Sequence, residues 1–256
     1  MRPLYISMNT KRYIRGSWII GFVALVIFAI CPQRHFAQER KVQNRPYIDM
    51  RRWHYGFLFG MHSQDLEFVH NGYQHQLEEG TTLESWYADV AAYSPGFSVG
   101  VLGELYLTEY LALRIIPTMH FGDKQVHLRD QFSGIVVNQT MKSTYLSVPV
   151  DVKYAAQRFN NYRPYLVAGV APMVDLTQKK QKPLLLQRFD CALEVGFGCD
   201  FYLPFFKLIP ELKFCFGLVD LLVKDRSDLI DKNLLKYTQS LDGVSSRMVV
   251  LTLYFE

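Results

Sequence analysis

The chain has 256 residues and a formal net charge of +4; 49% of its residues are hydrophobic and 20% are charged. This balance excludes an intrinsically disordered chain. Residues 1–37 hold five bases and no acid, which leaves 23 bases against 24 acids in the rest. A nearly neutral body excludes a general nucleic-acid-binding protein that relies on phosphate neutralisation. Aromatic residues reach 14%, an excess that needs a structural reason.

The N-terminus carries an export signal. Residues 2–15 are basic and lead into an apolar run of 14 residues, 18–31. This arrangement is typical of a secretory signal peptide, and it is too short for an inner-membrane anchor, which needs about 20 apolar residues. A lipoprotein at Cys31 is disfavoured because Ile30 before it is bulky. We therefore predict a signal peptide over residues 1–37, cleaved after Ala37.

Residues 38–52 are predicted to form a periplasmic N-terminal segment. Between residues 39 and 52 it carries five bases against two acids. Pro46 and the lack of alternation indicate a tail rather than a further strand. The charge either adjoins anionic head groups or docks a partner, and the sequence does not separate these two roles.

The remaining residues, 53–256, alternate between apolar and small or polar side chains with a period of two. This alternation, in segments of about ten residues, is the signal of an outer-membrane β-barrel. The segments are residues 55–61, 97–107, 111–121, 146–154, 163–174, 188–202, 208–216 and 248–255. We predict an all-β fold: an eight-stranded antiparallel transmembrane β-barrel in the cell outer membrane.

The connections support a barrel over a soluble sandwich. Short turns are expected at residues 108–109, 155–162 and 203–206, and long loops at residues 63–95, 122–142, 175–187 and 218–245. Bacterial barrels place short turns in the periplasm and long loops outside the cell. The first loop is expected to contain a hairpin at Asn71–Gly72, and residues 218–237 are expected to contain an amphipathic helical turn.

Aromatic residues gather near the proposed periplasmic rim, where amphipathic rings prefer the head-group level. The predicted belt consists of Trp53, Tyr55, Tyr106, Tyr110, Tyr154, Tyr162, Tyr202, Phe205, Phe206, Tyr254 and Phe255.

Charged residues fall on the predicted inward face. They are Glu104, Arg114, Asp151, Lys153, Glu194, Asp200, Glu211 and Lys213. A proton relay or a substrate site is one interpretation. A structural ion-pair network is favoured, because an eight-stranded barrel is only wide enough to be filled by side chains and buried charges must be paired. An open pore is disfavoured for the same reason.

No catalytic, cofactor-binding or metal-binding residue is predicted, and we expect a protein that is not an enzyme. His62, Ser63 and Asp65 are close in sequence, but the chain has no Gly-x-Ser-x-Gly elbow. His70 and His75 flank the expected hairpin rather than a metal site. No small-molecule substrate is indicated. After residue 37 the cysteines Cys191, Cys199 and Cys215 have no metal-ligand spacing and are expected to be buried thiols, with Cys215 on the opposite face from the other two.

Two segments, YLSVPVDVKY at residues 145–154 and RPYLVAGVAP at residues 163–172, resemble the small outer-membrane barrel domain common in Bacteroidetes. Three more are similar to the PorT (SprT) family of the type IX secretion system: WHYGFLFGMHSQDL from residue 53, EVGFGCDFYLPFFK from residue 194 and YTQSLDGVSSR from residue 237. The resemblance spans about residues 45–256.

This resemblance implies a non-enzymatic barrel that supports export of cargo proteins across the outer membrane. Its expected partners are outer-membrane lipid and other type IX components, and it assigns no catalytic residue. The alternative is a generic small outer-membrane barrel that acts as a surface adhesin or as a binder of lipid or a small ligand.

Overall fold

The computed structural model describes residues 43–73, 75–76, 83–90, 95–177, 182–227 and 229–256. The predicted signal peptide therefore lies outside the described residues. The chain divides into two units, Met1–Lys41 and Val42–Glu256, and every strand belongs to the second.

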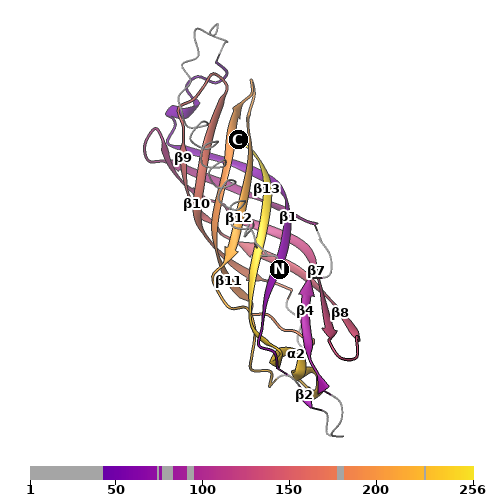
Figure 1. Cartoon of the computed structure of the whole chain (residues 1–256). Coiled ribbons are helices and arrows are strands. Elements are labelled where there is room, and N and C mark those ends of the chain that lie inside the picture. Colours follow the sequence, from indigo (N-terminus) through magenta and orange to yellow (C-terminus); the bar gives the residue numbers. More distant parts are fainter. Residues whose placement is uncertain (1–42, 74, 77–82, 91–94, 178–181, 228) are drawn as a thin grey trace, which may run out of the picture. The chain divides into compact units, whose positions relative to one another are not determined.

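The described residues of the second unit form one antiparallel sheet of eleven strands and one small sheet of two strands (Figure 1). The small sheet pairs β2 (His75–Gln76) with β3 (Leu83–Glu84). The large sheet contains β1 (Trp53–His70), β4 (Trp86–Val90), β5 (Pro95–Tyr106), β6 (Leu111–Ile115), β7 (Thr118–Asp130), β8 (Val136–Ser147), β9 (Val150–Ala155), β10 (Tyr162–Asp175), β11 (Phe189–Tyr202), β12 (Lys207–Gly217) and β13 (Leu241–Phe255). The helical elements are η1 (Ile48–Met50), η2 (Lys232–Leu234) and α2 (Leu235–Gln239).

The large sheet closes on itself as a barrel. β1 pairs with β13 on one side and with β5 on the other, and β10 pairs with β11 to complete the ring. Two walls of the ring are each interrupted beside a proline: Pro117 separates β6 from β7, and Pro149 separates β8 from β9. Proline cannot donate a ladder hydrogen bond, so strand assignment breaks there. β5 pairs with both β6 and β7, so these two strands occupy one position in the ring, here called a wall, and β8 and β9 occupy another. Counted in this way, the ring has eight walls, as predicted.

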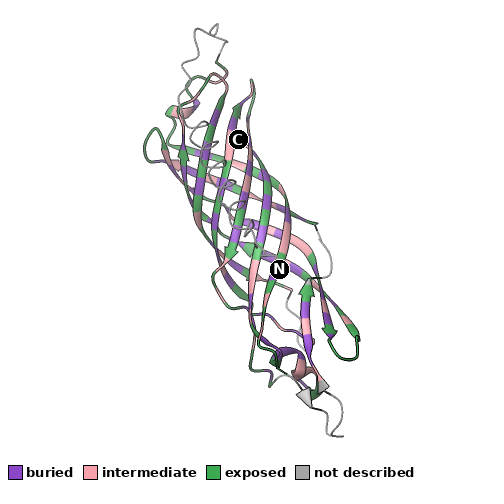
Figure 2. Ribbon diagram, in the orientation of Figure 1, coloured by how far each residue is buried: buried purple, intermediate pink, exposed green. Residues whose placement is uncertain are grey.

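The period-two alternation determines which side chains face the lumen. Along β11 the apolar Leu193, Val195 and Phe197 are exposed on the outer surface, and the residues between them face inward. Figure 2 shows the same alternation of buried and exposed residues along the neighbouring walls. The result is an outer belt of apolar side chains that fits a bilayer core.

Beyond this belt, toward the tip of the β7–β8 hairpin, the polarity of the inner and outer faces is exchanged. On β7 the outward residues change from Phe121 to Asp123 and Gln125, and the inward residues become Val126 and Leu128, both fully buried. The strands continue past the bilayer while the apolar side chains move inside. The predicted loop at residues 122–142 is therefore wrong in large part: β7 and β8 form a long hairpin closed by residues 131–135.

The first loop contains a small antiparallel pair, β2 with β3, but the predicted position of the hairpin at Asn71–Gly72 is wrong. β1 extends to His70, and its end pairs with Leu241 and the following residues of β13 rather than with the residues after Gly72. Gly72 does adopt a positive φ of 72°, which glycine accommodates without strain. A hairpin requires pairing with the next segment, whereas here the end of β1 pairs with β13 and the next strand, β2, pairs with β3.

The alternation of turns and loops predicts an orientation in the membrane. Cysteines introduced at Gln131 and Lys232, both exposed at the loop end, should react with a membrane-impermeant thiol reagent on intact cells. A cysteine at Glu109, exposed in the turn between β5 and β6, should not react until the outer membrane is permeabilised. Wild-type protein, which carries its own cysteines, provides the background. Labelling of Glu109→Cys on intact cells would show that the barrel has the opposite orientation.

Candidate functional site

All eight charged residues predicted to face the lumen do so, and none is more than 5% exposed. They come from β5, β6, β9, β11 and β12, whose inward positions converge on the barrel axis. Each of the five acids lies within ion-pair distance of a lysine or arginine. The structural ion-pair network favoured by the sequence is therefore what the lumen contains.

Arg114 on β6 lies at the centre of this network. Its Nε is 3.1 Å from Oε2 of Glu104, and its Nη1 is 2.7 Å from Oε2 of Glu211. The guanidinium also stacks over the ring of Tyr165 at 4.7 Å, and the Tyr254 hydroxyl donates to Glu211 at 2.7 Å. One arginine thus joins β6 to β5 beside it and to β12 across the lumen.

Two lysines extend the network in both directions along the axis. Lys153 contacts Asp200 at 2.8 Å and Glu104 at 3.2 Å, and Lys213 contacts Glu194 at 3.0 Å. These contacts join neighbouring and facing walls and fill the lumen between them. Such a network holds the walls in register and leaves little room for a solute.

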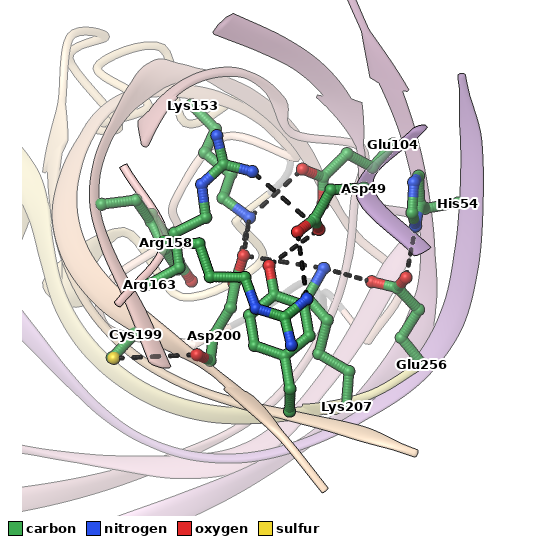
Figure 3. A network of polar contacts seen from close by, with 12 residues as sticks. Asp49, His54, Glu104, Lys153, Arg158, Arg163, Cys199, Asp200, Lys207 and Glu256 are labelled. Carbon is green, nitrogen blue, oxygen red and sulfur yellow. Dashed lines mark hydrogen bonds and ion pairs between the residues drawn. The ribbon is translucent and has the colours of Figure 1, made fainter. Parts of the chain in front are cut away.

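The sequence missed the ion pairs nearest the short turns. Lys207, fully buried, lies 2.8 Å from Glu256, and His54 Nδ1 contacts the same carboxylate (Figure 3). Figure 3 also shows Lys207 directed toward Asp200, 3.6 Å away. Lys207 and Glu256 lie at strand ends, where too few alternating residues remain to predict whether a side chain faces the lumen or the outside.

The predicted aromatic belt is correct in part. Trp53, Tyr55, Tyr154 and Phe205 are among those exposed on the outer surface. Three members are instead buried in the lumen: Tyr106, Tyr202 and Tyr254. The period-two alternation would have assigned these tyrosines to the lumen, because each lies two positions after an inward-facing residue, as Tyr202 does after Asp200.

The end with short turns is closed by residues 43–52, here named the strap. Asn44 donates from Nδ2 to the Tyr202 carbonyl at 3.0 Å, and Tyr202 donates its hydroxyl to Asp49 at 2.7 Å. Arg158 contacts Asp49 (Figure 3). Arg158 also donates to the Asn44 carbonyl, so the turn after β9 holds the strap as well. The strap contains η1 and no strand. It is docked across the barrel end and is not the free tail that the sequence suggested.

The opposite end is closed by an apolar cluster. Its buried members are Leu66, Trp86, Ala88, Val126, Leu128, Leu184, Leu186, Leu221, Leu222, Tyr237, Leu241 and Val244. The expected amphipathic helical turn is present as η2 and α2, and Tyr237 packs edge-on against Trp86 at 4.8 Å. Before this helical turn, Leu222 and Leu229 are buried, whereas Ile230 is exposed.

Among the described residues, an ion pair joins α2 to β3 in the first loop. Lys236 lies 2.7 Å from Glu84, and its hydrogen bond holds the pKa of this carboxyl below the ordinary value. A lowered carboxyl pKa means that the pair stabilises the folded cap above the ordinary pKa of about 4.3, and that this contribution is lost as pH falls through the lowered value. We expect the protection of the α2 amides against exchange, measured relative to their intrinsic exchange rate at the same pH, to decrease below about pH 4 by the roughly 0.2–1 kcal/mol of a surface pair.

Glu84→Gln should lower this protection at neutral pH by the same amount and abolish its decrease at acid pH. Glu67→Gln, a carboxyl on β1 that pairs with Arg247 away from α2, is the matched control and should change neither. Equal exchange in wild type and Glu84→Gln at every pH would show that the pair does not hold the helix.

The histidines do not form a catalytic or metal site in the part of the chain that the structure describes. His62 is buried in the lumen and its Nδ1 lies 2.8 Å from Ser98 Oγ, whereas Asp65 is exposed on the opposite face. His70 contacts the backbone of Ala88. No group of three or more metal-ligating side chains comes together among the described residues.

The three described cysteines are free thiols. Cys215 is buried in the lumen, with its Sγ 3.5 Å from Glu194 Oε1, so its predicted position on the opposite face is confirmed. Cys191 and Cys199 are only half-buried, on or near the outer surface of β11.

A closed ring of eight walls, an outer apolar belt and an ion-paired lumen define an outer-membrane β-barrel. The chain matches the family described as the outer membrane protein beta-barrel domain over residues 36–223, so it belongs to that family. It is accordingly a protein of the cell outer membrane. No helix among the described residues has the length and apolar character needed to span a membrane.

Solved structures to which the chain is similar include Ail, the attachment invasion locus protein of Yersinia pestis. It is 12% identical, with a TM-score of 0.33, and the match covers 80% of this chain and 99% of Ail. Ail in complex with the heparin analogue sucrose octasulfate is 14% identical, with a TM-score of 0.34 and the same coverage. AlkL in DMPC lipid bilayers is 11% identical, with a TM-score of 0.33, covering 88% of this chain and 97% of AlkL. Comparison with curated protein sequences gives no significant match.

Proposed function

We propose that this barrel is a non-enzymatic component of a type IX protein-secretion apparatus, and that it supports cargo export through contacts with other components. The observation that carries this proposal is the state of the lumen. It is filled by ion pairs and covered at one end by the strap and at the other by the apolar cluster. A barrel filled in this way acts through its surfaces rather than as a passage.

The sequence segments that resemble the PorT family support the secretion role. They lie on β1, on β11 with the turn that follows it, and on α2 with the start of β13. β13 pairs with β1, and β12 alone separates β13 from β11. The resemblance therefore concentrates on one side of the ring, as a shared contact surface would.

The strap supplies a periplasmic surface in this proposal. Tyr47 and Met50 are 73% and 78% exposed, and Arg51 and Arg52 are exposed beside them. Exposed aromatic residues with arginines are characteristic of protein-binding surfaces. Arg45 is different, because its Nη1 donates to the Glu256 carbonyl at 3.2 Å and so anchors the strap.

The proposal is tested by deleting the gene and measuring cargo export, which should fall and be restored by the wild-type chain. Replacing Arg51 and Arg52 by serine should leave a folded, heat-modifiable barrel but reduce export and co-purification with other secretion components. Lys224→Ser/Arg247→Ser, at the loop end, is the matched control. Normal export after deletion would reject the secretion role, and normal export by the double-arginine variant would exclude the strap from it.

A second candidate, a surface adhesin, is favoured by one observation. The tip of the β7–β8 hairpin exposes Phe132, Ile135 and Val136 together, beyond the outer belt. If deletion leaves export intact but lowers attachment of cells to surfaces, and Phe132→Ser/Ile135→Ser reproduces that loss, the adhesin function is the correct one.

A further inference from the structure

A cavity of about 190 Å³ lies where the barrel wall is incomplete. β8 pairs with β7 along its whole length, but with β10 only over residues 145–147. Beyond that point the described residues after β10 contact the edge of β8 by a backbone hydrogen bond of 2.9 Å from the Leu176 amide to the Thr144 carbonyl and by side chains. Gln139 exchanges two hydrogen bonds of 3.0 Å with the Leu184 backbone, and Thr177 donates to the Lys142 carbonyl at 2.9 Å. The cavity lies between these residues and β8.

Three lysines line the cavity: Lys124, Lys142 and Lys182. Among the described residues of its lining, Asp175 is the only carboxylate, and its Oδ1 already accepts from the Thr177 amide at 2.8 Å. The lining therefore carries an excess of positive charge, together with the hydroxyl of Tyr145.

Lys124 is the unusual member of this group. It is 6% exposed, and its Nζ donates to the Tyr145 hydroxyl at 2.9 Å. Within the part of the chain that the structure describes, no carboxylate lies within ion-pair distance of it, whereas the other buried lysines, Lys153, Lys207 and Lys213, each contact at least two. A buried ammonium without a counter-ion is costly, and an anion in the cavity would compensate it.

The position of the cavity relative to the bilayer indicates where that anion would come from. On the outer face of β8 and the residues after it, Leu146 and Val148 belong to the apolar belt, and the next outward positions are Thr144, Lys142 and Thr140. The cavity thus lies just beyond the hydrocarbon, at the level of the outer-leaflet head groups. Met141, Leu184 and Leu186 supply an apolar side to the same cavity.

We propose that this cavity binds the phosphorylated head group of an anionic amphiphile from the outer leaflet, with the buried Lys124 on the phosphate, the exposed Lys142 on the outward side of the cavity, and the leucines against the first carbons of the attached chain. This site is independent of the secretion role. Lysine is a common phosphate-binding residue that acts as a point charge, and the edge of β8 gives access from the membrane side.

The test measures binding of dodecyl phosphate to the full chain in neutral detergent, followed by the phosphorus NMR signal. Wild type should show saturable binding, and Lys124→Gln should weaken it at least tenfold. Lys224→Gln, an exposed lysine outside the cavity, should leave it unchanged. Lys142→Gln, which lies on the exposed face and should not affect folding, is the second variant and should weaken binding severalfold.

Inorganic phosphate serves as the second arm. A much higher affinity for dodecyl phosphate than for inorganic phosphate supports a lipid as the ligand. Equal affinities for the two would instead identify a free anion as the ligand. Absence of saturable binding, or binding that survives both Lys124→Gln and Lys142→Gln, would overturn the proposal.

Discussion

Replacing Arg114 by methionine is expected to lower the free energy of unfolding of the barrel by about 3–5 kcal/mol, the cost of leaving a buried charge without its partner. Arg114 is fully buried and contacts Glu104 at 3.1 Å and Glu211 at 2.7 Å. Methionine fills a similar volume but cannot neutralise either carboxylate. The measurement is urea unfolding of the protein refolded in lipid vesicles.

Two further variants distinguish charge from packing. Arg114→Met/Glu211→Gln removes both members of one pair and should be less destabilised than Arg114→Met alone. Arg247→Met removes an arginine whose side chain is 55% exposed and pairs with Glu67 outside the lumen, and it should cost less than about 1 kcal/mol. Equal effects of Arg114→Met and Arg247→Met would mean that the lumen is hydrated and that its ion pairs are not structural.

Placing an arginine at Val195 is the second large perturbation. Val195 is exposed on the outer face of β11, within the apolar belt, between Leu193 and Phe197. If it faces the middle of the bilayer, Val195→Arg should cost about 2–4 kcal/mol in vesicles. The same unfolding experiment measures it.

Val69→Arg is the matched control, because Val69 is also an outward, exposed valine on a barrel strand but lies beyond the belt on β1. A charge near or beyond the interface should cost about 0–1 kcal/mol. If Val195→Arg is as stable as Val69→Arg, the belt does not face lipid.

The sequence predicts the eight walls and the lumen charges well, and for one reason. Inside the bilayer, lipid requires an apolar outer face, so the period-two pattern reports both the strand and its orientation. Glu194 and Asp200 are assigned to the lumen simply because Val195 and Phe197 must face outward. The interruptions at Pro117 and Pro149 do not shift this parity, so the prediction survives them.

The same reasoning fails outside the bilayer. There water covers the outer face, and apolar residues such as Val126 and Leu128 turn inward to form the cap. A search for apolar-outward alternation therefore reads residues 122–142 as a loop, although they form a hairpin. The period is unchanged, but the polarity of the two faces is exchanged.

The strap illustrates a different limit. Its contacts join Asn44 and Asp49 to Tyr202 and Arg158, residues more than 100 positions away in the chain. No local periodicity encodes such pairings, which depend on the ring bringing the turn after β9 and the end of β11 together. The basic composition of the segment was visible, but its docking was not.

The central claim of this account is that the barrel is filled and closed, and single-channel conductance in planar lipid bilayers tests it most directly. The purified wild-type chain should insert without giving stable ion-conducting openings, because Arg114, Lys153 and Lys213 are paired across the lumen and both ends are covered. A steady open level in the wild-type protein, with the conductance of a water-filled pore, would contradict it.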